Sequence, residues 1–229
     1  MNQLIRSTDS LAASLRNKRL YHATPLHYLP SILAHRQLLC AERGQKLGIT
    51  PRKTASRRDK MLGVQKYVHF YFDLLNPLLS DKLNKGMPHC VLEFNAGQIY
   101  TDNVDRCALM PFNTKVWRSR ADAIPVENRD QMANMLSARD RFGRYPSMEF
   151  LVEGSVRVEK ILPITVFCER DFEIAEQVSK IFGVVTKPYV NLRIVNEYSA
   201  STGCSKTQHY LNLCVSTMLV QPLPNILFD

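Results

Sequence analysis

The chain has 229 residues, of which 45% are hydrophobic and 22% charged, and this balance is typical of a folded globular protein and excludes a disordered or fibrous one. No apolar run approaches the roughly 18 residues of a membrane span, and the first residues lack the apolar core of a signal peptide, so we expect a soluble, cytoplasmic protein without a membrane partner. Lys and Arg outnumber Asp and Glu by 30 to 21, and the resulting formal charge of +9 favours a polyanionic partner.

The six cysteines are widely spaced along the chain, without a C-x-x-C pair and without a histidine at metal-ligand spacing. A metal site is therefore not expected. Cys90 and Cys168 lie in apolar segments, which is typical of buried thiols in a reducing compartment. No polar or Pro/Gly-rich linker divides the chain, so we expect one domain over residues 1–229.

The N-terminal part of the chain predicts a helix, a strand and a second helix. Residues 9–18 carry apolar side chains at helical spacing. The segment RLYHAT at 19–24 follows as a strand that includes His22. Thr24-Pro25 is a helix-start signature, and the apolar stripe that follows it runs to about residue 35.

A strongly basic segment comes next. Between Ala41 and Lys60 there are seven basic residues against two acidic ones, a local charge of +5. We expect a helix over residues 51–62, which places Lys53, Arg57 and Lys60 on one outward stripe and turns Arg58 inward. The outward stripe is either an anion-binding site or a solvated basic surface.

The segment KYVHFYF at 66–72 alternates as a strand does. One face is purely apolar. The other carries Tyr67, His69 and Tyr71, and we expect that face to line something polar.

The remaining pattern predicts short strands with scattered helices, hence a mixed α+β fold. The region 118–146, rich in arginine, is expected to be a loop with a helix near 131–139. Further strands are expected at 89–95, 148–154, 161–168 and 189–195, and a helix at 171–182.

Glu149 is the most informative single residue, because it places a carboxylate in the otherwise apolar strand MEFLVEG. An unpaired buried charge costs several kcal/mol, so such a residue is paired, lies at an edge or belongs to a functional cleft. From the pattern alone, a solvent-facing and a catalytic position are equally open. For His22 and Tyr71, a structural role is the more common one for residues of their type in a strand. An inward Arg58 fits either a pyrophosphate or a structural ion pair.

Taken in order, four segments resemble the DarT family of DNA ADP-ribosyltransferases, toxins that occur paired with a macrodomain antitoxin. The segments are LYHATPLHYLPSIL at 20–33, the Arg57-Arg58 pair with its basic surroundings, YVHFYFDLLNPLL at 67–79 and MEFLV at 148–152. The recognisable core covers about residues 19–165, and residues 166–229 are its C-terminal continuation or an extension.

This resemblance implies the ADP-ribosyltransferase fold, a split sandwich of two small antiparallel sheets with flanking helices, whose cleft holds NAD as co-substrate. It assigns Glu149 and Arg58 as catalytic residues. The cofactor-binding residues it implies are His22 against the ribose, Ala23 and Thr24 through backbone contacts, Tyr71 against the nicotinamide, and Arg52.

The sequence departs from the family pattern at three places. The family often has Pro where this chain has His69, Met where it has Leu78, and Gly where it has Arg36-Gln37. None of these departures removes a residue that the chemistry requires.

The expected reaction passes through an oxocarbenium-like state, which a carboxylate such as Glu149 stabilises. Arg58 would hold a phosphate or polarise the acceptor base. A base stacked in a duplex cannot reach the anomeric carbon, so single-stranded DNA is the expected substrate, with Lys53, Arg57 and Lys60 on its phosphates. A monomer is expected, without a metal cofactor.

Two alternatives remain open from the sequence. One is an RNA-directed ADP-ribosyltransferase or a relative of the tRNA 2′-phosphotransferases. The other is a non-catalytic nucleic-acid-binding domain. The modified base and the role of residues 195–229 stay undetermined.

Overall fold

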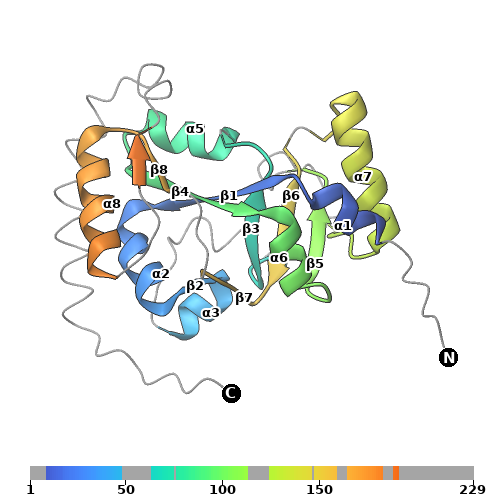
Figure 1. Ribbon diagram of the computed structural model, residues 1–229, viewed down its shortest axis with the longest axis horizontal. Helices are drawn as coiled ribbons and strands as arrows, with labels where there is room; N and C mark the ends of the chain where they lie inside the picture. The colour runs from blue at the N-terminus through green and yellow to red at the C-terminus, as the bar shows by residue number, and fades with distance from the viewer. Residues whose placement is uncertain are drawn as a thin grey trace. The chain divides into compact units, whose positions relative to one another are not determined.

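The computed structural model describes seven stretches of the chain, which fall into two compact units (Figure 1). The described stretches are residues 9–47, 63–74, 76–112, 124–145, 147–158, 164–182 and 188–190. The first unit combines the residues up to His22 with Leu38–Asn76 and Glu93–Arg157, and the second combines Ala23–Gln37, Pro77–Leu92 and the chain from Val158 onward.

Antiparallel strands form the centre of the first unit. Their order is β5 (Cys107–Met110), β6 (Glu149–Glu153), β3 (Tyr67–Tyr71) and β1 (Arg19–Pro25). β6 pairs with both neighbours along its length, whereas β1 joins β3 through a single residue pair, Tyr21 with Tyr71. Nearly every residue of β3, β5 and β6 is buried, which explains their aromatic and β-branched composition.

Three helices of the first unit begin at caps formed by Asp or Asn side chains. They are α1 (Ser10–Leu15), α6 (Ala96–Asp102) and α7 (Arg129–Phe142), capped by Asp9, Asn95 and Asn128 respectively. Each cap accepts hydrogen bonds from backbone N–H groups that the helix leaves unpaired. α1 packs against both α6 and α7 (Figure 1). The hydroxyl of Tyr100 donates to Asp9 at 2.6 Å, which ties α6 to the start of α1.

A turn joins β6, the strand that carries Glu149, to a smaller sheet. Gly154 follows β6 with a φ of +85°, a conformation that favours glycine, and the chain continues into β7 (Ser155–Arg157). β7 pairs with β2 (Gln37–Leu39), and the N–H of Cys40 donates to the carbonyl of Gly154 at 2.9 Å. The short helix α3 (Ala41–Lys46) begins directly after Cys40.

The second unit contains strands and helices of its own. Residues up to Leu92 of β4 (His89–Asn95) belong to this unit and pair antiparallel with β8 (Ile164–Val166), and β8 pairs parallel with β9 (Pro188–Val190). The helices of this unit are η1 (Leu26–Tyr28), α2 (Leu29–His35), α5 (Pro77–Asn84) and α8 (Glu169–Ile181). α8 packs against β8, β9 and α2.

The mixed α+β fold expected from the sequence is confirmed, and so are the elements it placed around residues 9–35, 66–72, 89–95, 148–154 and 171–182. Two expectations need adjustment. The first strand continues through Pro25, because a proline ring fits an extended φ, and the helix behind it divides into η1 and α2. The short elements β2, β5, β7, α3, α5 and α6 carry too few residues for a clear periodicity, and the sequence did not predict them.

The prediction that Cys90 and Cys168 are buried thiols is also confirmed. None of the helices in the described part of the chain combines the length and the apolarity that a membrane span requires. The single-domain expectation stays a prediction. The expected helix at 51–62 and residues 195–229 lie outside the described residues.

Candidate active site

Glu149 begins β6 and lies between two strands. It is directly opposite Tyr71 of β3 on one side and Met110 of β5 on the other, so these three side chains share one face of the sheet. Its side chain is only 1% exposed. The same face carries a buried apolar cluster formed by Val64, Tyr67, Ala108, Met110 and Leu151. A carboxylate in these surroundings requires a polar partner.

That partner is His69 of β3. Its Nδ1 lies 2.7 Å from Oε2 of Glu149, and its side chain is 22% exposed. His69 pairs in register with Leu151, so it reaches Glu149 diagonally across the two strands. On the other side of the ring, Nε2 lies 3.3 Å from the carbonyl oxygen of Val64. The strand face that was expected to line something polar therefore does so, and the buried carboxylate is paired.

His22 of β1 reaches the same strand from its other face. Its Nδ1 lies 2.9 Å from the backbone carbonyl of His69. The ring packs edge-on against Phe70 with a centroid distance of 5.8 Å, and Phe70 belongs to the face of β3 opposite His69 and Tyr71. The structure therefore brings Glu149, His69 and Tyr71 together, while His22 joins them through the β3 backbone.

Burial lowers the pKa of His22 from 6.5 to about 4, although the hydrogen bond to the His69 carbonyl works in the opposite direction. His22 is therefore neutral at pH 7. A carbonyl oxygen can only accept, so Nδ1 carries the hydrogen and Nε2 is an acceptor. Such a nitrogen can receive a hydrogen bond from a sugar hydroxyl.

The other residues assigned from the sequence fall into two groups. Ala23 and Thr24 follow His22 along β1 and belong to the second unit, where Thr24 is buried. The remaining five, Arg52, Lys53, Arg57, Arg58 and Lys60, lie outside the described residues. Their roles stay predictions.

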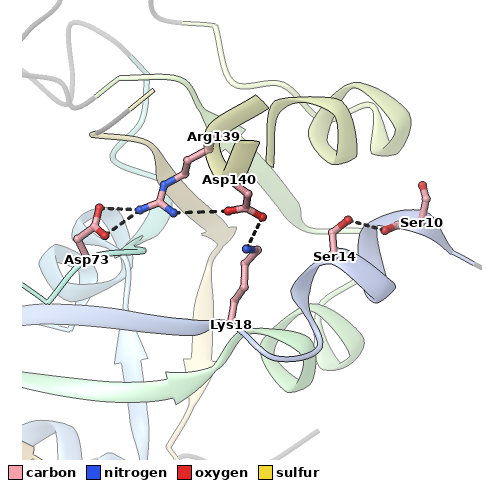
Figure 2. Close-up of polar contacts among 6 residues, drawn as sticks. All are labelled: Ser10, Ser14, Lys18, Asp73, Arg139 and Asp140. Atoms are coloured by element: carbon pink, nitrogen blue, oxygen red, sulfur yellow. Dashed lines mark hydrogen bonds and ion pairs between the residues drawn. The ribbon is translucent and has the colours of Figure 1, made fainter. Parts of the chain in front are cut away.

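An ionic network fixes α7, the helix that precedes β6, to the end of β3 (Figure 2). Nη2 of Arg139 lies 2.8 and 2.7 Å from the two carboxylate oxygens of Asp73, which comes two residues after Tyr71. The Arg139 guanidinium also lies over the ring of Phe72 at 5.2 Å. Next to it, Lys18 donates to Asp140 at 2.6 Å. The chain directly after Tyr71 is thus tied to α7.

Two of these contacts were not predicted from the sequence. The pattern placed His69 on the Tyr/His face of its strand but did not pair it with Glu149, and it indicated no role for Arg139. The available signal for the first was the alternation itself, since both strands place ionisable side chains on one face. Arg139 carried no comparable signal, because arginines are frequent throughout the region 118–146.

Over the described part of the chain, no cluster of three or more His, Cys, Asp or Glu side chains is arranged to hold a metal ion. The polar side chains next to Glu149 are His69 and Tyr71, which suit an organic substrate with hydroxyl groups and an aromatic ring.

Residues 21–197 match the family model of DarT, described as single-stranded DNA thymidine ADP-ribosyltransferase. None of the curated proteins matches the sequence. Among solved structures, the chain is similar to DarT of Thermus sp. 2.9 in complex with ADP-ribosylated single-stranded DNA, with a TM-score of 0.58 and 18% identity over 77% of this chain and 94% of that one.

Two further structures resemble it. One is the same Thermus protein in complex with NAD⁺, with a TM-score of 0.55 and 19% identity over 76% of this chain and 93% of that one. The other is DarTG of Thermosipho africanus in complex with ADP-ribose, with a TM-score of 0.51 and 17% identity over 76% of this chain and 49% of that one. These likenesses confirm the expected ADP-ribosyltransferase fold.

Proposed function

The chain belongs to the DarT family of NAD-dependent enzymes that transfer ADP-ribose to single-stranded DNA, and from this premise we propose that it modifies thymine, with Glu149 as the catalytic carboxylate. The observation that carries the proposal is the placement of Glu149, a buried carboxylate on β6 opposite Tyr71 and held by His69. Without a functional role, such a carboxylate in an apolar cluster would be a costly feature.

In the proposed reaction, the bond between the ribose C1′ and the nicotinamide nitrogen breaks, and its electron pair remains on nicotinamide. A ring nitrogen of the base forms the new bond to C1′ and loses its proton. N3 is the only ring N–H of thymine in a nucleotide, so N3 is the proposed acceptor. Glu149 stabilises the developing positive charge on the ribose and accepts the N3 proton.

Four described residues support a binding role for NAD. His22 presents a neutral Nε2 to a ribose hydroxyl, and Tyr71 offers a ring beside Glu149 for the nicotinamide. Thr24, with Ala23, supplies backbone groups at the end of β1. We further propose that Arg52 and Arg58 bind a phosphate or the acceptor base, and that the phosphates of the DNA backbone are bound by Lys53, Arg57 and Lys60.

The test incubates the protein with NAD and single-stranded oligonucleotides of equal length, with and without thymine. We expect a mass increase of one ADP-ribose on the thymine-containing strand only, with release of nicotinamide. The variant Glu149→Gln, which keeps the size of the side chain but cannot accept a proton, is expected to lose at least about 100-fold in rate. Modification of the thymine-free strand, or a fully active Glu149→Gln, would overturn the assignment.

Matched RNA oligonucleotides in the same assay address the RNA-directed alternative, since only a DNA-directed enzyme leaves them unmodified. Thermal stabilisation by NAD separates an enzyme from a purely nucleic-acid-binding domain, because only a protein that binds NAD in its folded state gains stability from it.

We also propose that the protein acts in the cytoplasm as a monomeric toxin that a macrodomain antitoxin counteracts. Expression in a bacterial host should arrest growth, and expression of Glu149→Gln should not. Co-expression of an active macrodomain that removes ADP-ribose should restore growth, whereas continued arrest would contradict the pairing.

A further inference from the structure

The contact between His69 and Glu149 brings a titratable group to the proposed catalytic carboxylate. Oε2 of Glu149 is 2.7 Å from Nδ1 of His69, and the carboxylate is almost fully buried while the imidazole keeps some contact with solvent.

The hydrogen-bonding groups around the ring determine where its protons lie. The carbonyl of Val64 can only accept, so its contact with Nε2 places a hydrogen on that nitrogen. Nδ1 then either donates to the carboxylate, as part of an imidazolium, or accepts from a protonated carboxyl group. In both cases one proton lies between Nδ1 and Oε2, and the pair shares it.

The pair can release this proton at the cost of one contact. Neutral His69 must then place its hydrogen on Nδ1 to keep the bond to Glu149, and Nε2 turns a lone pair toward the Val64 carbonyl. The held, one-proton form and the released form therefore differ in structure as well as in charge.

Within the described part of the chain, the neighbouring strands bring the following other ionisable groups near the pair. From β3 itself, Tyr67 donates to Glu127 at 3.1 Å, and Tyr71 lies opposite Glu149. From β6, Glu153 pairs with Lys66 at 3.2 Å. β5 contributes only Ala108 and Met110 to this face, and β1 contributes His22 through the His69 carbonyl.

We propose that His69 is a positioning residue for the transfer reaction, which holds Glu149 in place and shares with it a proton that must leave before Glu149 can accept one from the base. The inference rests on the proposed role of Glu149. If the pair still held its shared proton, transfer from the thymine N3 would place two protons on a buried His–Glu pair. Starting from the released form, the same step returns the pair to its one-proton form.

After transfer, that single proton must leave the site before the next turnover. His69 is the more exposed member of the pair and provides the route to solvent. The reaction thus balances, with one bond to nicotinamide broken, one bond to the base formed and one proton released through the pair.

The experiment compares kcat and KM for NAD and for a thymine-containing oligonucleotide between about pH 5 and 8.5, the range that brackets histidine titration. We expect the kcat of the wild-type protein to rise with pH in a single step, and to rise tenfold for each pH unit below the midpoint of that step. His69→Asn keeps an amide donor near the position of Nδ1 but cannot titrate, and we expect it to retain kcat within about tenfold at pH 8 and to lose or displace that step. His69→Leu removes the donor and should lower kcat by at least about tenfold while changing both KM values less than threefold.

A matched control is His35→Asn, which replaces a half-buried histidine of α2 whose Nδ1 bonds to the Ser31 carbonyl in its own helix. Its profile should match wild type. An unchanged step in His69→Asn, or an unchanged kcat in His69→Leu, would overturn the inference. If His69→Leu fails to fold, His69→Asn alone decides it.

The outcomes also separate this inference from the proposed function. An active Glu149→Gln would refute the role of Glu149 itself. An inactive Glu149→Gln together with a wild-type profile in His69→Asn would leave the proposed function intact and remove only the role of His69.

Discussion

His22 should make the folded protein sensitive to mild acid. Its pKa is 6.5 in the unfolded chain and about 4 in the folded protein, mainly because of burial. The folded state therefore binds the proton less readily than the unfolded state, so this contribution to stability is fully present above about pH 6.5 and is lost as the pH falls toward 4.

The size of the effect follows from the two pKa values. Between about pH 7.5 and 5, these two pKa values of His22 correspond to a loss of at most about 2 kcal/mol in the unfolding free energy. This value is an upper limit because the His22 ring keeps some contact with solvent. Urea unfolding of wild type and of His22→Asn at both pH values measures it. Asn can still donate to the His69 carbonyl but does not titrate.

We expect the unfolding free energy of wild type to fall by up to about 2 kcal/mol more than that of His22→Asn over this interval. All other titrating groups are common to the two proteins, so they cancel in the difference. Equal losses in both proteins would show that His22 is not held neutral by its surroundings, and the acceptor role of Nε2 toward a ribose hydroxyl would lose its basis.

Three further predictions concern the framework of the site. The Arg139–Asp73 pair is partly exposed, so a double-mutant cycle of Arg139→Met and Asp73→Asn by urea unfolding should give a coupling energy of about 1 kcal/mol, and zero coupling would contradict its role in fixing α7 to β3. Arg36 ends α2 with a φ of +49°, so Arg36→Gly should raise the melting temperature, whereas Gly154→Ala, at a φ of +85°, should lower it. Each substitution should change the unfolding free energy by roughly 1 kcal/mol or less. Melting-temperature shifts of the same sign in the two variants would refute the strain argument. Burial raises the pKa of Cys107 to about 12, so peptide mapping after brief exposure of the folded protein to an alkylating reagent at pH 8 should find this thiol unmodified, and rapid labelling would mean that β5 opens readily.

The sequence determined the strand and helix identities wherever the periodicity was long or the side chains alternated clearly. In MEFLVEG and KYVHFYF, alternation alone assigned each side chain to a face, because successive residues of a strand point to opposite sides. The pairing of Tyr71 with Glu149 agrees with those assignments. The order of the four resembling segments was sufficient to recognise the family, which the match over residues 21–197 confirms.

The tertiary structure alone decided which of these side chains meet. Alternation could not show whether Glu149 faced solvent or protein, because burial depends on the neighbouring strands. It could not pair Glu149 with His69 either, since that contact depends on the register between strands 80 residues apart in the chain. Nor could it place His22 on the Phe70 side of β3. Local pattern thus specifies the face on which a side chain lies, whereas register and packing between distant segments specify its partner, its protonation and its chemistry.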